Sequence, residues 1–83
     1  MLNMFKTRKV ATYKATVDMQ IEEWADVMGC GSYIITVKRG QTIGLYQYGN
    51  GAFSHLQIGN SKVGKDGLFT PLESILSNCV IVQ

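Results

Sequence analysis

Ser32–Ile58 decides the fold of this chain, and it reads SYIITVKRGQTIGLYQYGNGAFSHLQI. It contains three runs of β-branched, aromatic and aliphatic residues, a composition that suits a pleated, half-buried strand. The runs are residues 33–37, 43–48 and 52–58. Turn signals separate them, and Asn50-Gly51 is a strong one because both residues reach positive φ at low cost. This stretch therefore predicts a three-stranded antiparallel meander.

Before the meander, residues 11–22 alternate between apolar and polar side chains. Period two is typical of a strand with one face on the core and the other in water. A stripe at helical spacing overlaps the end of this pattern and consists of Ile21, Trp24, Ala25 and Met28. Asp18 is suited to cap such a helix. We predict a strand to about Val17 and then a helix within residues 18–28 that packs Trp24 into the core. Continuation of the first strand through these residues is the alternative.

After the meander, residues 59–67 form a polar loop with three glycines. Thr70-Pro71-Leu72-Glu73 then resembles a capping box, with threonine at the N-cap, proline in the first turn and glutamate at the third helical position. It predicts a short helix that ends near Ser77, followed by a buried final strand over residues 79–82.

Together these elements predict an α+β fold: an antiparallel sheet of about five strands with two short helices, in the order β-α-β-β-β-α-β. A length of 83 residues allows a single domain, residues 1–83, in which residues 1–8 form a flexible arm. No apolar run reaches the ~20 residues of a membrane helix, and residues 1–9 lack the apolar segment of a secretory signal. We therefore expect a cytoplasmic protein with no membrane partner and with Cys30 and Cys79 reduced.

The net charge of +2 is too small to indicate a nucleic-acid binder by itself, and it counts against a protein that mimics DNA, which should be strongly acidic. The basic residues concentrate near the N-terminus, whereas several acidic ones lie between Asp18 and Asp26. The chain is thus polarised more than it is basic.

Catalytic and metal sites find little support in the sequence. Cys30 and His55 could form a nucleophile and base, but no shared motif links them. Residues 59–66 approach a phosphate-binding P-loop, yet Asp66 replaces the hydroxyl residue that would bind magnesium. His, Cys and acidic residues do not occur at metal-ligand spacing. We expect no enzyme activity, no cofactor and no metal, although the Lys62 and Lys65 loop could still bind an anion.

Aromatic and basic side chains in and after the meander are the candidate binding residues: Tyr33, Lys38, Arg39, Tyr46, Tyr48, Phe53, Lys62 and Lys65. Rings beside cations suit single-stranded nucleic acid, whose bases stack on them. Packing of the rings across strands or in a subunit contact is the simpler explanation, and we favour it given the low charge.

The meander presents more apolar and tyrosine-bearing surface than two short helices can cover, which predicts a homo-oligomer or a protein partner. We expect a small non-catalytic binding module. By analogy of size and type, it is similar to accessory proteins with which phages and mobile elements bind and inhibit a host protein. The alternative is a binder of a nucleotide, another anionic ligand or single-stranded nucleic acid, through the strand tyrosines and the Lys62 and Lys65 loop.

Overall fold

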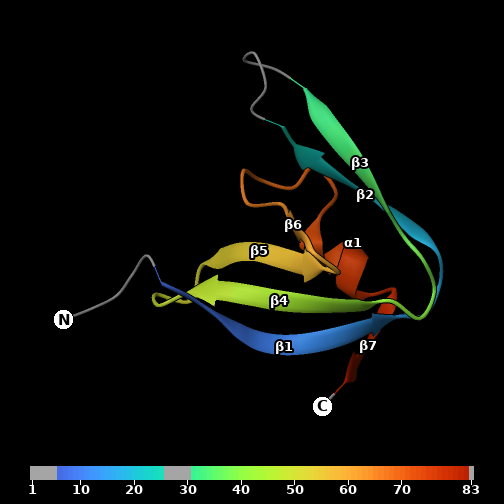
Figure 1. The fold of residues 1–83 in the computed structure, drawn as a ribbon, viewed down its shortest axis with the longest axis horizontal. Helices are drawn as coiled ribbons and strands as arrows, with labels where there is room; N and C mark the ends of the chain where they lie inside the picture. Colours follow the sequence, from blue (N-terminus) through green and yellow to red (C-terminus); the bar gives the residue numbers. More distant parts are fainter. Residues whose placement is uncertain (1–5, 26–30, 83) are drawn as a thin grey trace.

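Strands dominate the computed structural model, which describes residues 6–25 and 31–82 (Figure 1). The elements are β1 (Thr7–Ala15), β2 (Met19–Trp24), β3 (Ser32–Val37), β4 (Thr42–Tyr48), β5 (Phe53–Ile58), β6 (Ser61–Val63), α1 (Leu72–Leu76) and β7 (Cys79–Val82). Five strands form one antiparallel sheet in the order β6-β5-β4-β1-β7, and β2 and β3 form a second sheet.

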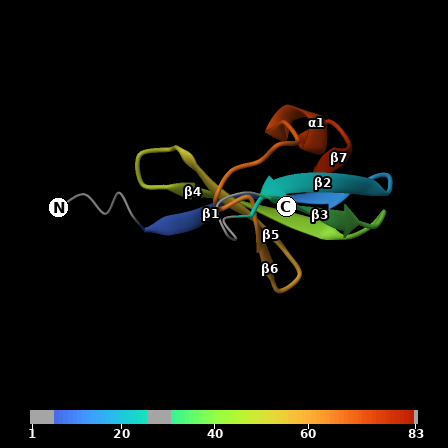
Figure 2. The same cartoon turned by 90° about the horizontal axis from the view of Figure 1, so that it is seen from above.

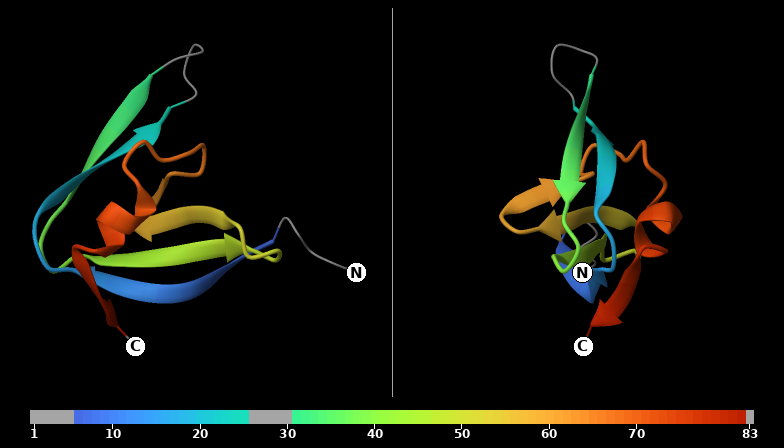
Figure 3. Two further views of the ribbon diagram at one scale, coloured as in Figure 1. Left: turned by 180° about the vertical axis from the view of Figure 1, so that it is seen from behind. Right: turned by 90° about the vertical axis from the view of Figure 1, so that its right-hand side faces the viewer.

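One long antiparallel ribbon contributes to both sheets. One of its arms is β1 followed by β2, and the other is β3 followed by β4. β1 pairs with β4, and β2 pairs with β3, so the ribbon runs from one sheet into the other. A sharp corner separates its halves, where the Gly40 amide donates to the Ala15 carbonyl at 2.8 Å and the Arg39 amide to Asp18 Oδ1 at 2.8 Å. Beyond the corner the β2–β3 half turns back over the five-stranded sheet (Figure 3).

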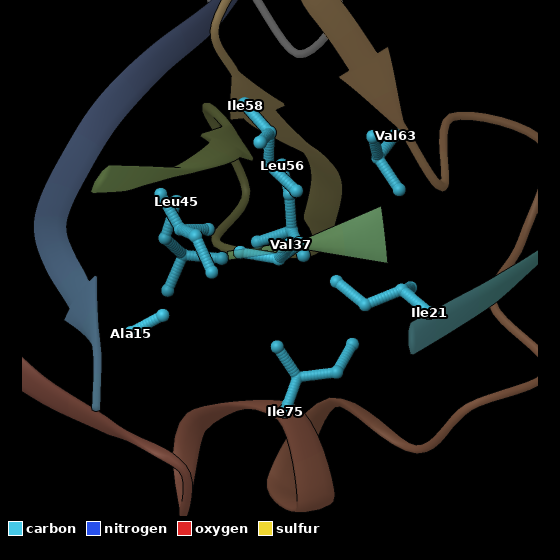
Figure 4. Close-up of a cluster of buried hydrophobic side chains, with 9 residues drawn as sticks. Ala15, Ile21, Val37, Leu45, Leu56, Ile58, Val63 and Ile75 are labelled. Carbon is cyan, nitrogen blue, oxygen red and sulfur yellow. The ribbon is translucent and has the colours of Figure 1, made fainter. Parts of the chain in front are cut away.

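The core lies between the five-stranded sheet and this returning half. Ile21 of β2 and Val37 of β3 meet Leu45 and Leu56 of the sheet, and Ile75 of α1 closes another side (Figure 4). Viewed from above, α1 and the β5–β6 hairpin lie on opposite sides of the β2–β3 ribbon (Figure 2). One face of the large sheet is therefore covered by the chain itself, and the other is left outward.

The predicted α+β fold with two helices is wrong, because the described residues contain one short helix and mostly strands. Residues 19–24 form β2, and residues 26–28 of the expected helix lie outside the described residues. These residues form a strand and not a helix because Met19 and Ile21 continue the series of inward-facing side chains and every residue of β2 has a partner on β3. Trp24 consequently lies on the solvent side, 42% exposed, instead of in the core.

The three-stranded meander is also wrong in one strand. The β4–β5 hairpin at Asn50-Gly51 is confirmed, but residues 33–37 pair with β2 in the other sheet. A further strand, β6, lies inside the predicted polar loop and completes the five-stranded sheet. The third run does not add to the predicted surplus of apolar surface on the meander, since Leu56 and Ile58 are buried in the core.

At the C-terminal end, α1 is present but the capping box is not. The N-cap is Pro71, whose ring carries no hydrogen-bonding group, and no side-chain hydrogen bond caps the helix. The Thr70 hydroxyl instead accepts the Glu22 amide of β2 at 2.8 Å. β7 forms as predicted, but at the sheet edge, where Val80 and Ile81 are 52% and 64% exposed.

Candidate nucleic-acid interface on the open sheet face

The outward face of the five-stranded sheet gathers lysines and aromatic rings. Residues that pair directly across antiparallel strands share a face, and Lys9 pairs with Tyr46, which pairs with His55. We call this surface the basic face and define it by Lys9, Lys14, Tyr46, Tyr48, His55 and Lys62. It spans β1, β4, β5 and β6.

Gly44 lies at the centre of the basic face and explains its tight packing. A Cβ at this position would lie 3.3 Å from Lys9 Cε and 3.3 Å from Tyr46 Cε1. The lysine stem and the tyrosine ring thus occupy the space over the glycine, against the backbone of β4. Absence of a side chain at Gly44 is what lets these two groups come together.

Tyr46 stacks on His55, with ring centroids 4.6 Å apart and an angle of 14° between the planes. His55 is only 4% exposed, and its Nδ1 lies 2.8 Å from the Ser54 hydroxyl, within hydrogen-bond distance. Burial, and secondarily the charge of Lys62, lower the pKa of His55 below its ordinary value of 6.5. The lowered pKa favours the neutral imidazole, which supports the Tyr46 ring without adding a charge to the face.

The charges of the molecule are segregated around this sheet. Its five strands contain Arg8, Lys9, Lys14 and Lys62 but no aspartate or glutamate. The acidic residues of the described chain lie elsewhere: Asp18 at the corner, Glu22 and Glu23 on β2, Asp66 after β6, and Glu73 in α1. Although the net charge is only +2, the charge on this sheet is uniformly positive, so its surface attracts anions.

The structure brings together only some of the predicted binding residues. Tyr46, Tyr48 and Lys62 share the basic face. Phe53 packs on the core side of the sheet. The others are dispersed: Tyr33 on β3, Lys38 and Arg39 at the corner, and Lys65 in the turn after β6.

Sequence reasoning missed Lys9 and Lys14 and gave His55 a different role. Lys14 had a usable signal, because it is a polar member of the alternation and must face away from the core. Lys9 had none. A bulge at Val10 shifts the register between Lys9 and Ala11, and it turns Lys9 to the outward face although its odd number predicts the inward one.

The other chemical groups do not form an alternative site among the described residues. Cys30 lies outside them, and the partners of His55 are Ser54 and Tyr46. Cys79 donates its thiol to the Ile75 carbonyl at 3.3 Å, and burial raises the pKa of this thiol. Across residues 6–25 and 31–82, no three His, Cys, Asp or Glu side chains meet to ligate a metal.

The near-match to a P-loop also lacks the geometry of that motif, because the segment after Gly59 forms β6 and α1 begins only at Leu72. Within the described chain, no helix has the length and hydropathy needed to cross a membrane.

Comparison with known proteins gives no identification, since no family model, no curated protein and no solved structure matches the chain. The geometry of the basic face is thus the main guide to function.

Proposed function

We propose that this protein binds single-stranded nucleic acid, without catalysis, on the basic face of its five-stranded sheet. The observation that carries the proposal is the segregation of charge: Lys9, Lys14 and Lys62 lie on an outward sheet face whose strands contain no acidic residue. A phosphate chain crossing the strands would meet cations from β1 on one side to β6 on the other.

The aromatic rings favour a single strand over a simple anion. Tyr46 and Tyr48 are half-buried on the same face, and the stack on His55 holds Tyr46 in place. Bases of a single strand are free to stack on such rings, at about 1–3 kcal/mol per base. Stacking does not require a base sequence, so we expect weak sequence preference. The cytoplasm is the compartment we propose for this interaction.

The decisive experiment measures fluorescence anisotropy of a labelled oligothymidylate of about 12 nucleotides, a length within the usual site size of a small sheet-based binder. Neutralising two lysines of the face, Lys9→Gln with Lys62→Gln, should weaken binding about tenfold or more at low salt. The matched control is Lys38→Gln with Arg39→Gln, which removes the same charge at the corner and should change affinity less than about threefold.

Two further measurements separate stacking from charge alone. Affinity should fall with salt with a logarithmic slope of about −2, as three phosphate contacts to a single strand give. Tyr48→Leu should lower affinity and leave this slope unchanged, because it removes a ring and no charge. The proposal fails if the oligonucleotide does not bind at about 50 mM salt, or if inorganic polyphosphate or duplex DNA binds equally well.

Inhibition of a host protein stays a prediction from size and type, and capture of a stoichiometric partner from a host lysate would test it. It does not require the basic face, so a protein partner could bind elsewhere on the molecule.

A further inference from the structure

The β2–β3 ribbon has one occupied edge and one open edge. On β2, the Trp24 amide donates to the Gly67 carbonyl at 2.9 Å, and the Phe69 amide donates to the Glu22 carbonyl at 2.9 Å. The segment after β6 therefore covers the outer edge of β2. On β3, no described strand pairs with the outer edge.

The register identifies the backbone groups at this open edge. Antiparallel pairs alternate between residues that bond to each other and residues whose N–H and C=O groups point away from the partner strand. Glu22 and Trp24 bond away from β3, so their partners Ile34 and Ser32 point away from β2. Thr36 follows by the same alternation. Ser32, Ile34 and Thr36 thus present their backbone groups outward, in a line.

β3 also lacks the features that normally prevent strands from pairing at an edge. It contains no charge, no proline and no glycine, and Tyr33 and Ile34 are 54% and 61% exposed on its two faces. The other two open edges are shorter: β6 has three residues and includes Lys62, and β7 has four. Among the described strands, β3 offers the longest uncharged edge.

We propose that β3 pairs antiparallel with β3 of a second copy of this chain, so that a four-stranded sheet β2-β3-β3-β2 forms across a twofold axis at Ile34. In this register Ile34 lies opposite Ile34 of the partner subunit, and Ser32 lies opposite the partner's Thr36. The outward backbone groups then bond to one another, and the partly buried Ile35 gains the ring of the partner's Tyr33.

Charge favours a second copy as the occupant. Glu22 is paired with Ile34, but its carboxylate extends toward the Ser32 end of β3, where it accepts the Ser32 hydroxyl at 2.7 Å. Lys38 and Arg39 follow the other end of β3. Antiparallel pairing brings the acidic end of each copy toward the basic end of the other. Asp18 also lies at this basic end, where its Oδ1 accepts the Arg39 amide. Its single negative charge is smaller than the two positive charges of the Lys38 and Arg39 side chains. A self-complementary, isologous contact of this kind is typical of twofold dimers.

Two matched substitutions test the proposal by light scattering after size exclusion. Ile34→Lys on β3 and Ile81→Lys on β7 place the same charge at positions of similar exposure, 61% and 64%, on two different edges. The wild type and Ile81→Lys should dimerise with rising concentration, and Ile34→Lys should raise the dimer dissociation constant at least tenfold. Thr36→Pro removes one outward N–H at the open edge and should weaken the dimer as well.

A disulfide measures the register directly. In a Cys30→Ser, Cys79→Ala background, Ile34→Cys should cross-link two copies, since bonded pairs place Cα atoms about 5.5 Å apart, within disulfide range. Ile81→Cys is the control and should stay uncrosslinked. A monomer at every concentration up to about 1 mM, a dimer disrupted by Ile81→Lys but not by Ile34→Lys, or faster cross-linking at 81 than at 34 would each overturn the proposal. The test does not depend on nucleic-acid binding.

Discussion

His55 makes the stability of this protein depend on pH. Its pKa is lowered in the fold, chiefly by burial, so the unfolded chain binds more protons than the folded one near and below pH 6.5. The free energy of unfolding should therefore fall as the pH drops from 7 through 6.5 and level off below the folded pKa. Urea unfolding across this range measures the effect, and His55→Gln should flatten the curve.

The same histidine reports on its neighbour. It is the single histidine of the chain, so one resonance follows it through an NMR titration. Lys62→Gln should move its pKa upward, toward 6.5, because the lysine charge contributes to the depression. An unchanged pKa in that variant would show that the Lys62 charge does not act on the imidazole.

Gly64 is the glycine at which a side chain should be most harmful. Its φ is +83°, a Cβ would lie 2.7 Å from Leu68 Cδ2, and its amide donates to the buried Glu23 Oε1 at 3.0 Å. Gly64→Ala should cost about 2–4 kcal/mol, from the left-handed backbone and from overpacking together. Gly59→Ala is the matched control, because φ there is +60° with no atom within 4 Å. It should cost about 1–2 kcal/mol. Equal losses in denaturant unfolding would contradict the packing argument.

At the scale of elements, Thr70 links the segment before α1 to β2 in place of capping the helix. Thr70→Val removes the acceptor of the Glu22 amide and should cost about 1 kcal/mol, whereas Thr70→Ser should restore most of it. Hydrogen exchange distinguishes the two roles: the Glu22 amide should exchange faster in Thr70→Val, and the amides of α1 should not. Faster exchange confined to α1 would instead support the capping box.

Local signals predicted the elements better than their partners. The Asn50-Gly51 hairpin, the first strand and the last strand follow from turn chemistry and alternation, which act within a few residues. The pairing of β3 with β2 could not be predicted in this way, because the sequence has glycines on both sides of β3, Gly31 and Gly40, and either neighbouring strand is a plausible partner. The helix error has a physical cause as well: Ile21 and Ala25 satisfy both periods, and pairing across the ribbon decides between them.

The candidate site was predictable only in part for the same reason. Tyr46 and Tyr48 lie on one strand, so their shared face follows from period two. Lys9 joins them through a bulge and a strand pairing that link positions far apart in the sequence. Tyr33 was wrongly grouped with the tyrosines of β4, since the corner places it in the other sheet.

For the whole molecule, the folded-over ribbon separates two surfaces with different chemistry. The lysines of the basic face lie on the outward side of the five-stranded sheet. The acidic residues of the described chain concentrate on β2, at the corner and in the segments after β6. The open β3 edge lies in the second sheet, so self-association there does not involve the strands that form the basic face. A dimer of this kind would present two basic faces and could bind one long strand with higher avidity than a monomer.

The corner also fixes how the chain can change in length. Ala11, Tyr13, Ala15, Met19 and Ile21 all contact the core, and Ile35, Val37, Ile43 and Leu45 do so on the other arm, so odd-numbered positions stay inward across the bend. A single residue inserted at 16–18 or 38–41 would reverse that parity beyond the bend and turn the apolar set toward water, unless a bulge absorbed it as the bulge at Val10 does in β1. Insertions of two residues preserve the parity. Related genes that differ in length here should therefore differ by even numbers of residues.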